Sequence, residues 1–100
     1  MVLLENIGEA AMLEQTAEEC SELAQACLKL ARKIRNENPT PKSVDEIKEN
    51  LAEEAADVLI CLEELAGTSY DAKRVDSWIS AKEARIKERL GIDVSTGNNC

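Results

Sequence analysis

Apolar residues recur at steps of three and four along most of the chain, and this helical period constrains the fold more than any other feature. Leu, Ala, Glu, Lys and Arg dominate the 100 residues, whereas there are only four glycines, two prolines and two aromatic residues. Because this composition favours helix, the sequence predicts an all-α protein. The longest apolar stripe, which we expect to be buried, contains Leu13, Ala17, Cys20, Ala24, Cys27, Ala31 and Ile34. Leu23 and Leu30 widen this face on one side and Leu28 on the other, so we expect the helix to contact more than one neighbour.

Turn-forming and capping residues divide this pattern into helices. The segment NENPTP at 36–41 predicts a loop after a long first helix, since proline and the residue before it disfavour helix. Ser43, followed three residues later by Glu46, has the sequence of a capping box and predicts a helix that ends near Gly67. We expect its buried face to contain Ile47, Leu51, Ala55, Val58, Leu62 and Leu65.

The two ends of the chain have weaker signals. A last helix is expected over residues 71–90, with a stop at Gly91. Residues 3–10 have a weak helical pattern with a kink at Gly8, and residues 91–100 are expected to form a frayed tail. We expect the last helix to turn Val75, Trp78, Ile79, Ile86 and Leu90 inward.

Charge and cysteine usage limit the function classes. A net charge of −8 argues against a nucleic acid polymer as partner, because phosphate binding needs a basic face. The start lacks a basic region before its short apolar run, and no run has the length of a membrane span, so we expect neither a signal peptide nor a membrane partner. The four cysteines form no CxxC pair and there is no histidine, which disfavours a zinc site. The sequence therefore predicts one small cytoplasmic domain with reduced thiols.

Two acidic motifs lie on the two central helices. Glu19 and Glu22 are three residues apart, as are Glu54 and Asp57, so each pair projects from one side of its helix. If the helices form an antiparallel hairpin, the pairs Glu19–Asp57 and Glu22–Glu54 have a common midpoint inside the predicted loop. The two arms then differ by only about 3 Å in length, so the four carboxylates come level. Their angular positions predict a site at the edge of the helix–helix contact.

Four converging carboxylates repel one another unless a cation lies between them. Oxygen ligands at this density suit Mg²⁺, with Mn²⁺ as an alternative. A solvated acidic surface is the competing interpretation, because a chain with 20 acidic residues generates such pairs freely. Glu46 and Glu49 form one pair of this kind with no evident role.

Taken together, EECSELAQA at 18–26 and LAEEAADVLI at 51–60 resemble the paired E-E-x-x-E and E-x-x-D motifs of the MazG-like, all-α nucleoside triphosphate pyrophosphohydrolases. The similarity extends over residues 10–90 and includes the final W-x-x-x-K-x-x-R-x-x-x-R-L helix. It implies a single MazG-like domain over residues 1–100, an antiparallel helical bundle that assembles into homodimers or homotetramers. It also implies Mg²⁺-dependent hydrolysis of a nucleoside triphosphate (NTP or dNTP) to the monophosphate and pyrophosphate.

The resemblance assigns roles to particular residues. It places the metal ligands at the four acids selected by the register: Glu19, Glu22, Glu54 and Asp57. Glu18 or Glu53 could orient the attacking water, or could be ordinary surface glutamates. Half of the 12 basic residues lie in the last helix, and the resemblance makes Lys82 and Arg85 the candidates for binding substrate phosphates, against ordinary surface pairing.

Several alternatives stay open. Trp78 is expected to be a core residue, with stacking on a base as the alternative. Phosphoribosyl-ATP pyrophosphohydrolase shares the helical fold and is a neighbouring enzymatic hypothesis. A non-catalytic helical interaction module, whose apolar face binds a partner helix, is the hypothesis from another class. The sequence does not indicate which base or sugar is preferred.

Overall fold

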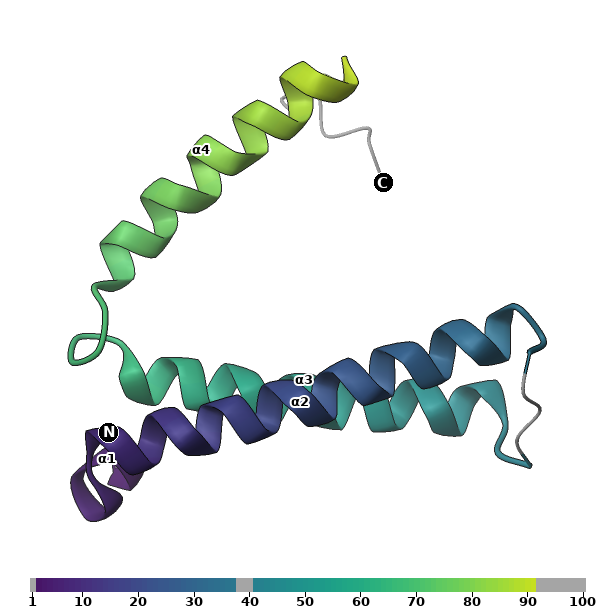
Figure 1. Ribbon diagram of the computed structural model, residues 1–100, viewed down its shortest axis with the longest axis horizontal. Helices are drawn as coiled ribbons and strands as arrows, with labels where there is room; N and C mark the ends of the chain where they lie inside the picture. Colours follow the sequence, from purple (N-terminus) through teal and green to yellow (C-terminus); the bar gives the residue numbers. More distant parts are fainter. Residues whose placement is uncertain (1, 38–40, 92–100) are drawn as a thin grey trace. The chain divides into compact units, whose positions relative to one another are not determined.

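The computed structural model describes residues 2–37 and 41–91. It contains four helices, α1 (Val2–Ile7), α2 (Glu9–Ile34), α3 (Val44–Leu65) and α4 (Ala72–Leu90), and no strand is present in those two ranges (Figure 1). The all-α prediction is therefore confirmed. Apart from Gly91, the predicted frayed tail lies outside the described residues, as does Cys100. No helix in the described part of the chain is long and apolar enough to cross a bilayer.

The helices begin and end where local sequence signals predict. Ser43 caps α3: its hydroxyl accepts from the backbone N–H of Glu46, and the Glu46 carboxylate accepts from the backbone N–H of Ser43. Gly8 separates α1 from α2 with a φ of 87°, which L-residues rarely adopt, and Gly91 ends α4 in the left-handed conformation.

The chain divides into two compact units, one ending at Ser69 and the other beginning at Tyr70. In the first unit α2 and α3 pack along each other, and α1 contacts both (Figure 1). Helices α2 and α3 run antiparallel, because the start of α2 lies beside the end of α3. There the Glu9 carboxylate accepts a hydrogen bond from the Ser69 hydroxyl. Similarly, the backbone N–H of Leu4 donates to the Glu64 carboxylate at 3.0 Å, which fixes α1 beside the last turn of α3.

The face of α2 that packs on α3 is not the one predicted. The predicted stripe stays exposed, except for the half-buried Ala31, and it includes Cys20 and Cys27. The buried or half-buried row includes Met12, Thr16, Glu19, Leu23, Ala26 and Leu30. Of these, only Leu23 and Leu30 belong to the predicted face, on the side where they widen it. At 100° per residue this row lies roughly 90° round the helix from the predicted stripe. The predicted centre of the face was wrong because α2 has a second row, which packs on α3 although it contains a threonine and a glutamate.

On α3 the predicted face is closer to the observed one. Ile47, Val58 and Leu65 are buried, Leu51 and Ala55 are half-buried, and Leu62 is exposed. Cys61, which the prediction omitted, is buried in the same row. The second unit differs: α4 has no buried residue, and its apolar side chains, including Trp78 at 50% exposure, are open to solvent. The inward face predicted for α4 is therefore not buried.

Candidate functional site

Three carboxylates meet where α2 and α3 pack together. Glu19 and Glu22 on α2 and Glu54 on α3 each offer an oxygen, and these oxygens lie within 4.8 Å of one another. The register derived from the loop midpoint brings these same residues level. The clustering therefore follows from the antiparallel packing and from the three-residue spacing on α2.

Glu19 lies within the contact between the helices and not at its edge, because it occupies the same row as Met12 and Ala26. The Gln15 side-chain amide donates to Glu19 Oε1 at 2.9 Å. Glu19 Oε2 and Glu54 Oε2 are both inaccessible to solvent and have no hydrogen-bond partner. Burial raises the pKa of Glu19, and the negative charges of Glu22 and Asp57 raise it further.

These observations test whether a cation fits. A buried carboxylate oxygen without a partner is unfavourable unless it is protonated or binds a cation. Two such oxygens in a group of three carboxylates form a hard, anionic donor set that suits Mg²⁺ or Mn²⁺. Glu22 is exposed, so one side of the group is open to water and to a ligand. The residues present therefore fit a divalent cation.

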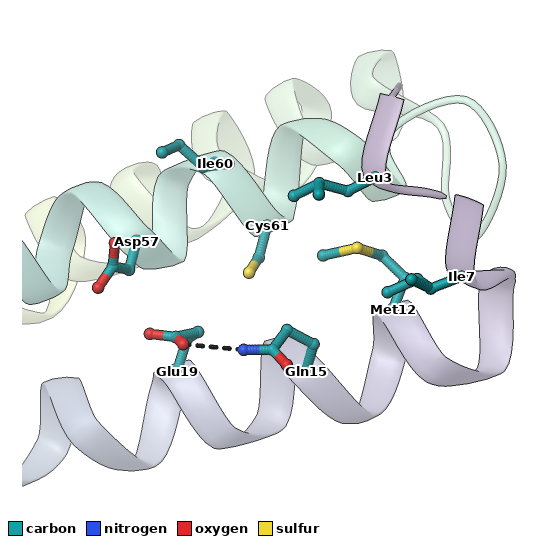
Figure 2. A pocket seen from close by; sticks show the side chains of 8 residues that line it. All are labelled: Leu3, Ile7, Met12, Gln15, Glu19, Asp57, Ile60 and Cys61. Carbon is teal, nitrogen blue, oxygen red and sulfur yellow. Dashed lines mark hydrogen bonds between the residues drawn. The ribbon is translucent and has the colours of Figure 1, made fainter. Parts of the chain in front are cut away.

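Asp57, the fourth predicted ligand, lies beside this group. It is half-buried, and its charge acts on Glu19. Figure 2 shows the two side chains directed toward each other from opposite helices. Asp57 is not one of the three residues whose oxygens all lie within 4.8 Å of one another, so it belongs to the rim of the group.

The remaining predicted site residues lie elsewhere. Glu18 and Glu53 are exposed and are not members of the three-carboxylate group. Lys82 and Arg85 belong to α4, in the second unit. The Lys82 ammonium lies 5.9 Å from the centre of the Trp78 ring, a cation–π distance. Phosphate binding by these two basic residues stays a prediction.

A partly open cavity of about 480 Å³ adjoins the acidic group in the first unit (Figure 2). Glu19 and Asp57 line one end. The rest of the lining is mostly apolar or sulfur-containing and comes from all three helices of the unit: Leu3, Ile7, Met12, Gln15, Ile60 and Cys61. Burial raises the pKa of the Cys61 thiol, so this side chain is neutral at physiological pH.

Six of the eight residues that line the cavity were not predicted as site residues, and two of them had a usable sequence signal. Gln15 is four residues before Glu19, and that spacing could have indicated a contact on one helix face. Cys61 is four residues after Asp57 and could have been placed by the same rule. The cavity itself had no sequence signal, because its far wall is α1, whose position depends on the contact between Leu4 and Glu64.

Comparison of this chain with protein-family models, with curated proteins and with solved structures gave no match. The resemblance to the MazG-like pyrophosphohydrolases therefore depends on the two acidic motifs and the final helix alone, and it stays a hypothesis.

Proposed function

We propose that the chain is a Mg²⁺-dependent nucleotide pyrophosphohydrolase of the MazG-like class. The observation that carries the proposal is the three-carboxylate group of Glu19, Glu22 and Glu54, with two buried oxygens that have no partner. The acidic motifs that resemble that family contain these same residues. An ordinary solvated acidic surface gives no reason for a glutamate to occupy a buried row between two helices.

In this proposal Glu19, Glu22 and Glu54 hold the cation, and Asp57 completes its acidic surroundings. A bound divalent cation neutralises phosphate charge and lowers the pKa of a coordinated water. Water attacks the α-phosphorus and its proton is released to solvent. The bond from that phosphorus to the oxygen that bridges the α- and β-phosphates breaks, and pyrophosphate leaves with the electron pair. Glu18 and Glu53 are the candidates for orienting the water, since each is exposed and directly precedes a proposed ligand, Glu19 or Glu54, in the sequence.

Exposed apolar surface supports self-association into dimers or tetramers, with α2 and α3 acting as a helical hairpin in a larger bundle. Leu13, Ala17, Cys20 and Ala24 form an exposed apolar face on α2. A monomer rarely leaves so long an apolar face in water, and a second helical hairpin would cover it as in a four-helix bundle. Sedimentation or light scattering should then give a mass of two or four chains, and Leu13→Lys should lower it.

The same face supports the alternative from another class, a non-catalytic module that binds a partner helix. The two proposed functions differ in whether the three-carboxylate group binds a cation. A module needs no cation, so its stability and its partner binding should be independent of Mg²⁺.

The test is hydrolysis of a panel containing each NTP and dNTP together with phosphoribosyl-ATP. Purified protein is incubated with Mg²⁺ or Mn²⁺, and the monophosphate and pyrophosphate are measured. We expect turnover of at least one nucleotide and its loss in Glu54→Gln, which keeps the shape of the side chain and removes its charge. If phosphoribosyl-ATP is the only substrate in the panel that is hydrolysed, the chain is a phosphoribosyl-ATP pyrophosphohydrolase.

A matched control for this test is Glu49→Gln, which removes one charge from the exposed surface of the same helix. If no substrate is hydrolysed with either metal, or if Glu54→Gln and Glu49→Gln have the same activity as the unmodified chain, the enzymatic proposal is wrong.

A further inference from the structure

The cavity beside the acidic group has two chemically different ends. Glu19 and Asp57 make one end anionic, and Leu3 and Ile7 make the other end apolar. Figure 2 shows Gln15 and Cys61 between these ends, on opposite helices. A ligand that fills the cavity must therefore be polar or cation-associated at one end and largely apolar at the other.

The size of the cavity also limits the ligand. Its volume of about 480 Å³ lies within the range of about 300–1,000 Å³ that is usual for small-molecule sites. Three walls shape it, and the α1 wall is held in place by the hydrogen bond from Leu4 to Glu64. The neutral Cys61 thiol and the Met12 side chain add polarisable surface without charge. Such a lining favours a flat, neutral, polarisable ring system over a charged group.

We propose that this cavity holds the nucleoside half of the substrate, with the base against α1 and the phosphates directed toward Glu19 and Asp57. The inference rests on the proposed function and adds to it a location for the base. A nucleoside triphosphate has the required asymmetry, because its base is neutral and flat whereas its phosphate chain needs a cation beside the carboxylates.

The lining also predicts how the base is selected. None of the described residues around the cavity is aromatic, so stacking between rings does not hold the base. Selection then depends on the distance between the α1 wall and α3, and on Gln15. An amide has two N–H donors and one acceptor oxygen. With one donor engaged on Glu19, Gln15 has further capacity to bond the sugar or the base.

The test separates binding of the base from binding of phosphates. The probes are α,β-methylene nucleoside triphosphates, which lack the scissile oxygen, and inorganic tripolyphosphate, each with Mg²⁺. Ile60→Trp and Ile7→Trp enlarge exposed side chains on two different walls. Leu59→Trp is the matched control: Leu59 precedes Ile60 on α3, is 65% exposed and does not line the cavity.

We expect Ile60→Trp and Ile7→Trp to raise the dissociation constant of the nucleotide analogue by about tenfold or more, since small changes in an apolar pocket have effects of this size. Their affinity for tripolyphosphate should be unchanged, and Leu59→Trp should bind both probes like the unmodified chain. In the unmodified chain, the ring current of the base should shift the methyl NMR resonances of Met12, Ile7 and Ile60, whereas tripolyphosphate should not. This spectrum needs no variant to fold.

The opposite results would overturn the inference. They are equal affinity of the unmodified chain for analogue and tripolyphosphate, methyl resonances that do not respond to the base, or normal analogue binding by both tryptophan variants. Failure of the proposed function looks different, because the unmodified chain would then bind neither probe in the presence of Mg²⁺.

Discussion

Magnesium is expected to raise the melting temperature of this chain, and Glu19→Gln is expected to remove most of that rise. A ligand that binds only the folded state stabilises it by mass action. At a free Mg²⁺ concentration ten times the dissociation constant, the added stability is about 1.4 kcal/mol. For a domain of about this size, that corresponds to a rise of about 6–11 °C in the melting temperature.

The same substitution should have the opposite effect without metal. Glu19 Oε2 is buried without a partner, and Glu22 and Asp57 repel the Glu19 charge. A neutral glutamine of the same shape removes this repulsion, so metal-free Glu19→Gln should melt at a higher temperature than the unmodified chain. The two effects have opposite signs, which a general loss of packing does not produce.

The assay is circular dichroism at fixed protein concentration, with and without Mg²⁺, on the unmodified chain, Glu19→Gln and Glu49→Gln. Glu49 is exposed on α3 and lies outside the three-carboxylate group, so its substitution controls for the loss of one negative charge. An unmodified chain whose melting temperature Mg²⁺ leaves unchanged would show that the three-carboxylate group holds no cation. So would a Glu19→Gln variant that gains as much from Mg²⁺ as the unmodified chain and Glu49→Gln do.

Three further perturbations test the fold around the site. Burial and the charges of Glu22 and Asp57 raise the folded-state pKa of Glu19, so the folded state binds this proton more tightly than the unfolded state. The metal-free stability of the unmodified chain should therefore increase as pH falls from neutral through the raised pKa of Glu19, and melts of Glu19→Gln should lack that increase. Ser43→Ala removes the capping box and should lower the free energy of unfolding by about 1 kcal/mol, seen as a lower urea midpoint; an unchanged midpoint would contradict the role of the cap. Glu64→Gln weakens the acceptor of the Leu4 N–H, so hydrogen exchange at Leu4 should become several-fold faster while the middle of α2 stays protected; equal exchange in both proteins would mean that Glu64 does not hold α1.

The helix boundaries could be predicted from sequence because each has a local cause. The capping box at Ser43, the positive φ of Gly8 and the left-handed Gly91 all act within a few residues of the helix end that they define. It was also predictable that the three carboxylates lie at the same height along the helix pair. In two antiparallel helices joined by a known loop, the distance of each residue from the loop determines which residues face each other.

The packing face of α2 could not be predicted in the same way. The stripe through Leu13 and Ala17 is uniformly apolar, whereas the row that packs on α3 contains Thr16 and Glu19. A criterion based on hydrophobicity selects the first face. The observed choice depends on how α3 packs on α2, and a single helix does not contain that information.

The position of Glu19 has a consequence for engineering this chain. A laboratory selection for heat resistance in the absence of divalent ions would favour apolar replacements there, since Met12 and Ala26 in the same row are already buried. Such variants would have a higher melting temperature and would have lost the three-carboxylate group. For this reason, thermal tolerance and retention of the acidic group should be screened as two separate traits.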